Sequence, residues 1–442
     1  MKRGFYTIML AQFFSSLADN AVFVVAVQLL KSQGAAAWQP AALVPMFALF
    51  YVVLAPFVGA FADARPKGQV MFISNAIKVL GCLLMLTHLH PLLAYAVIGL
   101  GAAAYSPAKY GILTELLPTS QLVRANGWIE GLTISSIILG VLLGGQLVSH
   151  TVSSWLLQAD WPWVMLGINT APKAAIAVLV FVYALAAGFN TRIPRTGECL
   201  RPWRVLEHSG KQAGQRAGYL RSIWLLVLDF KHCNQILWRD RLGQISLATT
   251  SLFWGVSGNL RYIVLAWSAA ALGYSISQAS ALVGVVAIGT AVGAVVASIK
   301  VNLRQATRVI PLGIAMGVLV IFMNTISSVK LAVPFLVLLG GLGGFMVVPM
   351  NALLQHRGHA LMGAGRSIAV QNFNEQLCIL ALGLAYSQAT EWGLSAFGAI
   401  AGFGFMVAGT MWLIWKWYQR NLEKDGDVIE ALLLETDDDA MP

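Results

Sequence analysis

The sequence predicts an all-α membrane protein with twelve transmembrane helices arranged as two six-helix halves. Hydrophobic residues make up 58% of the chain and charged residues only 11%, whereas roughly 25% of an ordinary soluble domain is charged. Several features of the first half also recur in the second half at a nearly constant spacing. Two similar halves are typical of secondary transporters, in which the substrate site lies at the interface between the repeats.

The predicted spans follow from the apolar stretches. A spanning helix needs about 20 predominantly apolar residues, and twelve stretches of the chain meet this requirement. Because Asp19 and Asn20 interrupt the first, long stretch, it does not have the pattern of a cleaved signal peptide. We expect the spans near residues 5–30, 41–61, 69–88, 91–113, 126–149, 171–190, 243–271, 277–299, 308–327, 331–353, 364–388 and 394–418.

The stretches outside the spans define the domain organisation. We expect an N-terminal six-helix bundle at 1–190, a cytoplasmic linker at 191–242, a C-terminal six-helix bundle at 243–420 and an acidic, disordered tail at 421–442. Within the linker, Tyr219–Phe230 is apolar but too short to span a membrane, so we expect an interfacial helix there. The tail is expected to be disordered because acidic residues dominate it.

The repeat is clearest around two prolines. A Gly-Leu-Gly sequence followed five residues later by proline occurs at 99–107 and again at 341–349, and two residues beyond these prolines stand Lys109 and Asn351. Other matches at a similar spacing pair 14–20 with 253–259, and Glu130 with Glu375. These matches indicate an internal duplication.

Positive charge is distributed unevenly along the chain, whose formal net charge is +10. Lys and Arg gather in the connections after even-numbered spans, above all between residues 190 and 242. By the positive-inside rule, this pattern places both termini in the cytoplasm, and it accounts for the charge without a nucleic-acid partner. The four cysteines have no metal-binding or redox spacing, and no phosphate-binding Gly-x4-Gly-Lys-Ser/Thr loop occurs, so we expect no cofactor and no metal.

Two groups of the first half stand at membrane depth. Lys109 lies inside a span, and an ammonium there costs about 3 kcal/mol on insertion scales, so it normally faces a polar cavity. Asp19 and Asn20 lie near the centre of the first span, where a carboxylate must be protonated, paired or hydrated. A structural hydrogen bond between helices is the alternative for Asp19. Lys78, in the third span, is expected to be paired or to face a cavity.

The second half carries matching polar groups. Arg261 lies in the middle of the seventh span, and its guanidinium, which keeps its charge, is suited to bind a phosphate or a carboxylate. The alternative is an internal salt bridge with Asp19 or Glu375, which is compatible with ligand binding. Glu375 lies four residues after Gln371 on the same helix face, and Asn372 belongs to the same polar run. This run predicts a polar cavity wall.

The turn at residues 59–68 resembles the signature loop of the major facilitator superfamily. In that loop an aspartate and basic residues latch the two halves together on the cytoplasmic side, and Asp63, Arg65 and Lys67 are the matching residues. The match is degenerate, because the glycine after the aspartate is displaced and one basic position is missing. Charges on a short cytoplasmic turn can instead serve only as topology signals, so a gate and this alternative both stay open.

Longer matches identify a branch of that superfamily. The sequence resembles the lysophospholipid transporters of Gram-negative bacteria, and the matches spread over nearly all spans. The run Tyr-Ser-Pro-Ala-Lys-Tyr-Gly is the most specific of them. The matching segments are Ala11-Gln-Phe with Asp19-Asn20, Ala55-Pro-Phe-Val-Gly, residues 101–113, Thr250-Ser-Leu-Phe-Trp-Gly with Arg261, residues 347–355, and Ile368-Ala-Val-Gln-Asn with Glu375.

The resemblance implies inward flipping of lysophosphatidylethanolamine and lysophosphatidylglycerol across the inner membrane. There a separate acyltransferase/acyl-carrier-protein synthetase would reacylate the lipid as a functional partner. We expect no enzymatic activity in this chain, because none of its seven histidines begins the His-x4-Asp pattern of the acyltransferase. We also expect a monomer.

A lysolipid requires buried groups of both signs. Arg261 and Lys109 would hold the phosphate, while Asp19, Glu375 and Glu130 would hold an ammonium; Asn20, Asn351 and Asn372 complete the predicted substrate site. One alternative is a proton-coupled exporter of small amphiphilic molecules, with Asp19 or Glu375 as the proton carrier. Another is a non-transporting scaffold for the reacylating enzymes, which the insertion cost of these charges argues against.

Overall fold

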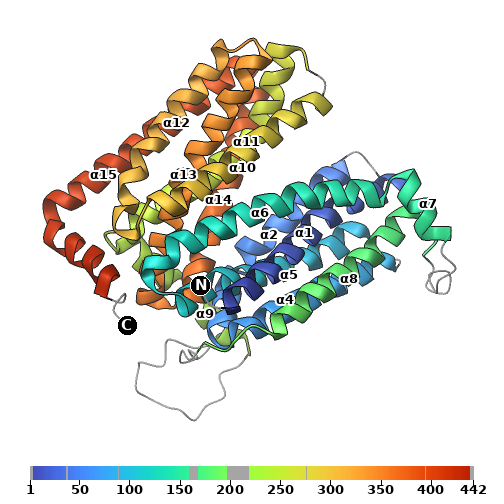
Figure 1. Ribbon diagram of the computed structural model, residues 1–442, viewed down its shortest axis with the longest axis horizontal. Helices are drawn as coiled ribbons and strands as arrows, with labels where there is room; N and C mark the ends of the chain where they lie inside the picture. Colours follow the sequence, from blue (N-terminus) through green and yellow to red (C-terminus); the bar gives the residue numbers. More distant parts are fainter. Residues whose placement is uncertain are drawn as a thin grey trace. The chain divides into compact units, whose positions relative to one another are not determined.

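The computed structural model describes residues 3–35, 38–87, 89–158, 168–196, 219–274, 276–393 and 395–438. Within these ranges the regular structure is helical and contains no strand (Figure 1). The helices of the first part are α1 (Arg3–Ser32), α2 (Trp38–Val53), α3 (Ala55–Asp63), α4 (Lys67–Leu86), α5 (Pro91–Leu116), α6 (Thr119–Leu147), α7 (His150–Gln158) and α8 (Ala171–Thr191). They are followed by α9 (Tyr219–Arg239), α10 (Gly243–Leu272), α11 (Ile276–Lys300), η3 (Leu303–Val309), α12 (Ile310–Phe322), η4 (Met323–Thr325), α13 (Val329–Met362), α14 (Ala364–Glu391) and α15 (Ala396–Asp438).

Each of the twelve predicted spans falls on one of these helices or on a run of them. Among the described residues, nine helices are long and apolar enough to cross a membrane, or ten if the bent pair α2–α3 forms one span. The predicted spans at 243–271 and 364–388 are α10 and α14, which are 30 and 28 residues long. Among the described residues, the end of α10 at Tyr262–Leu272 counts as a shorter apolar helix.

The second predicted span is bent rather than straight. The axes of α2 and α3 meet at 61°, with the break at Leu54. Pro56 is at the start of α3, where its missing N–H costs nothing, whereas within a continuous helix it would remove a hydrogen bond. The proline therefore explains why one apolar stretch forms two helices.

Contacts divide the chain into two compact units. Unit 1 consists of residues 1–116, 135–233 and 362–370, and unit 2 of residues 117–134, 234–361 and 371–442. The predicted halves place residues 117–134 in the first half and residues 362–370 in the second, whereas the contact-based units assign these two segments the other way round. Because of these segments, α6 and α14 each contribute to both units.

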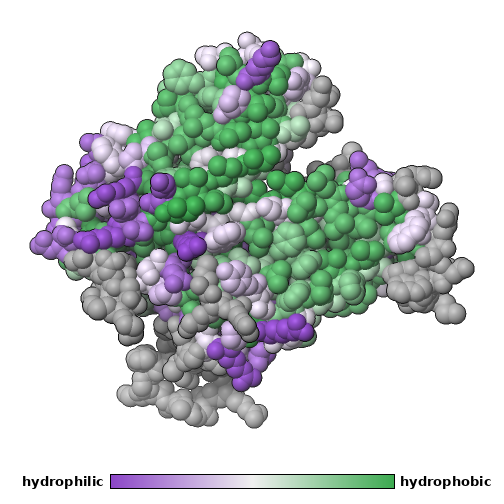
Figure 2. All heavy atoms as spheres, in the orientation of Figure 1, coloured by the Kyte–Doolittle hydropathy of each residue, from purple (hydrophilic) through white to green (hydrophobic). Residues whose placement is uncertain are grey.

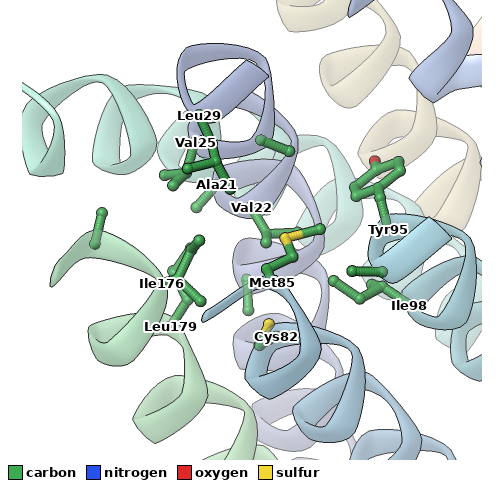
Figure 3. Packing of buried hydrophobic residues seen from close by; sticks show 14 of the residues in the cluster. Ala21, Val22, Val25, Leu29, Cys82, Met85, Tyr95, Ile98, Ile176 and Leu179 are labelled. Atoms are coloured by element: carbon green, nitrogen blue, oxygen red, sulfur yellow. The ribbon is translucent and has the colours of Figure 1, made fainter. Parts of the chain in front are cut away.

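The core of unit 1 lies between α1, α4, α5 and α8. Figure 3 shows Val22, Cys82 and Ile98 among the side chains gathered there. Gly81 lets α4 approach α5, since a Cβ on it would lie 2.5 Å from Cγ1 of Ile98. Gly140 on α6 approaches α1 in the same way, since a Cβ would lie 2.5 Å from the Leu17 carbonyl oxygen. Small residues thus bring helix backbones together, as they do in membrane bundles generally.

Glycines in and around the two repeated segments pack closely against neighbouring helices, but the two copies do not meet equivalent partners. A Cβ on Gly101 would lie 2.7 Å from the Ser74 carbonyl oxygen of α4. In unit 2, a Cβ on Gly344 of α13 would collide with the Thr290 carbonyl oxygen of α11, and one on Gly293 would collide with that of Gly341. Gly343, the counterpart of Gly101, faces the side chains of Phe253 and Met316 instead, so the duplication keeps the glycine but not the same helix contact.

The surface of the helices is apolar. Large side chains such as Phe181 (70% exposed) and Leu384 (72% exposed) point outward. Figure 2 shows hydrophobic residues over most of the visible face and hydrophilic residues gathered toward the ends of helices. An apolar belt of this kind is what lipid-facing helices require.

The structure differs from the predicted disordered tail. Residues 421–438 are the last turns of α15, which changes direction at Asp425, where the backbone is non-helical. Ile429 is only 1% exposed, and Asp425 Oδ2 lies 2.8 Å from Arg241 Nε. The physical reason is that apolar residues recur among the acids of the tail and give it a face that packs. The predicted helix at Tyr219–Phe230 coincides with α9, which continues to Arg239; its interfacial location stays a prediction.

Candidate functional site

Unit 1 contains a chain of buried polar side chains on α1, α4 and α8. Lys78 Nζ donates to Asp19 Oδ2 at 2.8 Å and to Ser15 Oγ at 3.0 Å. The other oxygen of Asp19, Oδ1, accepts a hydrogen bond from the Tyr183 hydroxyl at 2.7 Å. Ser15 in turn donates to Asn75 Oδ1 at 2.8 Å. Both carboxylate oxygens of Asp19 are therefore engaged within the protein.

In this set of hydrogen-bonded side chains, Asp19 is the partner of Lys78. Its side chain is only 1% exposed, and its ammonium also lies 4.8 Å from the ring centre of Tyr105 and 5.6 Å from that of Tyr183, within the range of cation–π attraction. The expectation that Lys78 is paired is confirmed. Sequence reasoning did not foresee that its partner is Asp19, because the rotation of each helix about its axis decides which side chains meet.

Two other candidates of unit 1, Lys109 and Asn20, make contacts of their own. Lys109 on α5 is buried, with Nζ 4.1 Å from the ring centre of Tyr110. Asn20 Nδ2 donates to the Ser16 carbonyl oxygen of its own helix at 2.8 Å. In the repeat, Asn259 Nδ2 donates in the same way to the Gly255 carbonyl oxygen at 2.8 Å. The duplicated asparagines therefore share a local hydrogen bond one turn back.

A second polar cluster of unit 1 surrounds Asp63. Its Oδ1 accepts hydrogen bonds from the Gly365 N–H at 2.6 Å and from Lys67 Nζ at 3.0 Å. Its Oδ2 accepts from the Arg366 N–H at 3.0 Å and lies 3.3 Å from Arg366 Nη1. Gly365 and Arg366 belong to the first turn of α14, so Asp63 caps the positive end of that helix.

Two further acids complete this cluster. Arg366 Nε donates to Asp229 Oδ2 on α9 at 3.0 Å, and Lys67 Nζ lies 3.1 Å from Glu115 Oε1. Arg65, by contrast, lies over the Phe61 ring at 5.5 Å. Of the three predicted gating residues, the structure thus joins two by an ion pair. We call Asp63, Lys67, Glu115, Asp229 and Arg366 the latch cluster.

Unit 2 contains a buried polar cluster on the stretch of α14 for which a polar cavity wall is predicted. Gln371 Nε2 donates to Asn351 Oδ1 of α13 at 3.0 Å and to Glu375 Oε1 at 2.7 Å. All three side chains are buried. Glu130, on α6, is also buried. Asn372 is half-buried on the same helix. The structure therefore brings Asn351 and Glu375 together through Gln371.

Other polar residues of unit 2 lie on α6, α10 and α13. Arg261 lies on α10, but its side chain falls outside the part of the chain that the structure describes. Asn126 and Gln355 exchange two hydrogen bonds, of 2.9 and 2.8 Å, in a buried amide pair. Sequence reasoning missed this pair. The available signal was two amide side chains in otherwise apolar helices, where an unpaired polar group is costly.

Comparison with known proteins identifies the superfamily to which this chain belongs. The family model described as Major Facilitator Superfamily matches residues 8–378. Among solved structures, the Escherichia coli fucose:proton symporter FucP aligns with a TM-score of 0.68 at 12% identity, over 94% of this chain and 98% of that one. The human organic anion transporter MFSD10 aligns with a TM-score of 0.69 at 14% identity, over 95% and 100% of the two chains. Since the family model matches most of the chain, the protein is a transporter of the Major Facilitator Superfamily.

More similar relatives define the branch. The lysophospholipid transporter LplT of Yersinia enterocolitica is 40% identical over 381 residues, which are 86% of this chain and 85% of the relative. LplT of Yersinia pestis is 39% identical over 394 residues, 89% and 88% of the two chains. At this identity and coverage the chain belongs to the lysophospholipid transporter family, as the motif resemblance predicted.

Proposed function

We propose that this protein transports lysophospholipids, moving lysophosphatidylethanolamine and lysophosphatidylglycerol inward across the inner membrane. The observation that carries this proposal is the 40% identity, over 381 residues, to a relative named as a lysophospholipid transporter. The motifs shared with that family include the buried Lys109, Asn351 and Glu375. Both termini would face the cytoplasm, as the positive-inside rule indicates.

The chemistry of the substrate accounts for the buried charges. A lysophospholipid has an anionic phosphate, a headgroup that in the ethanolamine form is cationic, and one acyl chain. Lys109 and Arg261 provide cations for the phosphate, and Glu375 with Glu130 provides anions for the ammonium. Asn351, Asn372 and Asn20 would supply hydrogen bonds. Asp19 can serve the ammonium only if it exchanges Lys78 for the ligand, because both of its oxygens are engaged.

The acyl chain imposes a second requirement. Moving it into water would cost about 0.8 kcal/mol for each CH₂, so the chain is expected to stay in apolar surroundings while the headgroup crosses. The apolar outer surface of the helices satisfies this requirement. Alternating access would come from rocking of the two repeats, with Asp63, Arg65 and Lys67 at the cytoplasmic gate.

The cellular role follows from the direction of transport. A lysolipid delivered to the cytoplasmic leaflet lacks one acyl chain, so a separate acyltransferase/acyl-carrier-protein synthetase is the functional partner that completes it. The transporter itself would work as a monomer.

Uptake into proteoliposomes tests the proposal directly. Purified protein should accelerate transfer of radiolabelled lysophosphatidylethanolamine relative to protein-free vesicles, and it should not transfer the diacyl lipid. The assay is run with and without proton and sodium gradients. Absence of lysolipid transfer by correctly inserted protein would exclude the proposed function, whereas export of other amphiphiles driven by a proton gradient would favour the exporter.

A further inference from the structure

The carbonyl oxygen of Gln371 is a buried hydrogen-bond acceptor that none of the described residues pairs with. Gln371 is 6% exposed, and its Oε1 atom has no hydrogen-bond partner among the residues that the structure describes. Buried polar atoms are usually hydrogen-bonded, so an unpaired one calls for an explanation. This atom differs from other unpaired atoms because its side chain bridges two predicted substrate-site residues, Asn351 and Glu375.

The orientation of the amide is fixed by its neighbours. Both N–H groups of Gln371 are used, at 3.0 Å to Asn351 Oδ1 and at 2.7 Å to Glu375 Oε1. Rotating the amide by half a turn would place its oxygen against the Glu375 carboxylate, which accepts hydrogen bonds and does not donate them when ionised. The Gln371 side chain therefore presents Oε1 away from both partners, as an acceptor held in place by its own donors.

We propose that Gln371 Oε1 accepts a hydrogen bond from a donor group of the transported lysophospholipid, and so helps to determine which lipids are carried. This inference rests on the proposed function and deepens it. In the present conformation Oε1 is enclosed by side chains, so the ligand reaches it when the helices move apart, as alternating access requires.

The substrate has two groups that can donate to this oxygen. One is the free glycerol hydroxyl, which every lysophospholipid has and diacyl phospholipids lack. The other is an N–H or O–H of the ethanolamine or glycerol headgroup. A neutral amide oxygen can accept from either group, whereas Glu375 beside it favours the charged ammonium. The shared chemistry is a single hydrogen-bond donor within reach of the Asn351–Gln371–Glu375 chain.

Substrate analogues distinguish the two sources. Uptake of lysophosphatidylethanolamine by wild-type protein is compared with that of its 2-deoxy analogue, which lacks the glycerol hydroxyl, and with lysophosphatidylcholine, which lacks headgroup N–H groups. Loss of one neutral hydrogen bond should slow uptake of the analogue that lacks the relevant donor by about three- to tenfold. The result identifies the source.

Gln371→Met tests the residue itself. This variant keeps a similar volume but has no carbonyl oxygen. It should therefore carry lysophosphatidylethanolamine and the analogue that lacks the relevant donor at similar rates, so that the ratio of these two uptake rates is close to one. The matched control is Asn374→Met, on the same helix, since the Asn374 amide is bonded instead to Asn234 and Trp238. The control should keep the wild-type ratio. A purely structural role for Gln371 would lower uptake of all three lipids equally.

The outcomes separate this inference from the proposed function. If wild-type protein carries lysophosphatidylethanolamine and both analogues at the same rate, the inference is wrong and the proposed function stands, whatever the folding of the variant. Unchanged ratios in correctly inserted Gln371→Met would also overturn it. If wild-type protein carries no lysolipid, both fall together.

Discussion

Lys78 and Asp19 are 59 positions apart in the sequence, yet their charged atoms lie 2.8 Å apart in a largely buried pair. Each was conspicuous in the sequence, because a charge at membrane depth is costly. The sequence did not reveal that they pair with each other, because the pairing depends on the rotation of α1 and α4 about their axes. The depth of a charged residue in a span can therefore be predicted from the sequence, whereas its partner cannot.

Removing one member of this pair should destabilise the protein. Lys78→Met leaves the partly buried Asp19 carboxylate beside Tyr183 without its cation, which is expected to cost up to about 3–5 kcal/mol. The double variant Asp19→Asn with Lys78→Met removes both charges and should recover much of that loss. Denaturant unfolding in detergent measures the difference. Equal destabilisation by the single and double variants would show that the two charges are not coupled.

Arg261 supports a prediction about transport rather than stability. Arg261→Ala should abolish lysolipid uptake, and Arg261→Lys should restore it only partly, because lysine lacks the planar fork that binds phosphate through two donors. Proteoliposome uptake at matched protein amounts provides the measurement. Near-normal uptake by Arg261→Ala would remove this residue from the proposed phosphate site.

The carboxylate of Glu375 distinguishes two roles by substrate. If it holds the ligand ammonium, Glu375→Gln should slow uptake of lysophosphatidylethanolamine more than that of lysophosphatidylglycerol, which has no ammonium. If it carries protons, both lipids should be affected equally and wild-type uptake should require a proton gradient. The ratio of the two uptake rates in one variant decides between them.

At the scale of elements, the positions of the helices could be predicted from the sequence, but their bends and close approaches required the structure. The twelve apolar stretches were found by length, yet the break at Leu54 and the helical end of α15 were not. The Gly-Leu-Gly repeat was visible in the sequence, but only the structure shows that the Gly341 carbonyl oxygen lies against Gly293 of α11.

A glycine pair on one helix tests this packing. Gly293→Ala places a methyl group against the Gly341 carbonyl oxygen, so it should lower the free energy of unfolding by about 1–3 kcal/mol. Gly284 is on the same helix, α11, and nothing lies within 4 Å of a Cβ there. Gly284→Ala should therefore be neutral or stabilise by up to about 1 kcal/mol. Thermal unfolding of both variants in detergent checks the contrast.

The end of α15 permits a similar comparison. Ile429 is 1% exposed and its neighbour Val428 is 53% exposed. Ile429→Ala should cost about 2–5 kcal/mol where the helix packs, whereas Val428→Ala should change stability by less than about 0.5 kcal/mol. Limited proteolysis of the last turns gives a local readout. Equal protease sensitivity of the two variants would argue against packing of this helix.

At the scale of the whole molecule, α14 is shared between the two compact units. Residues 362–370 belong to unit 1 and the residues from 371 onward to unit 2. Sequence reasoning predicted two separate halves, because hydropathy and repeats describe segments along the chain and not the contacts that they make. The same limit explains why Asp229, Glu115 and Arg366 were missed as partners of the signature loop.

The latch cluster should influence transport although it is remote in sequence from most predicted substrate ligands. Asp63→Asn removes the charge that accepts hydrogen bonds from Gly365 and Arg366, so it should weaken the hold on the start of α14 and slow uptake of every lysolipid to the same extent. Arg65→Gln is a comparison within the proposed gate and should slow uptake less, since Arg65 stacks on Phe61 and does not take part in the Asp63 hydrogen bonds to α14. A change in headgroup preference in Asp63→Asn would contradict a purely gating role.

One continuous helix carries both Arg366 and Gln371, and their separation of five positions corresponds to about 7.5 Å of helical rise. A helix is stiff over that length, so the two side chains move as parts of the same rod. If the hydrogen bonds between Asp63 and the first turn of α14 differ between two conformations, a lipid bound at Gln371 must favour one of those conformations. Thermodynamic reciprocity then requires the factor by which the lipid shifts the latch to equal the factor by which the latch shifts lipid affinity. A transporter built in this way would need no separate sensor of its substrate, because the helix held by Asp63 at the proposed gate would also be the helix that binds the lipid.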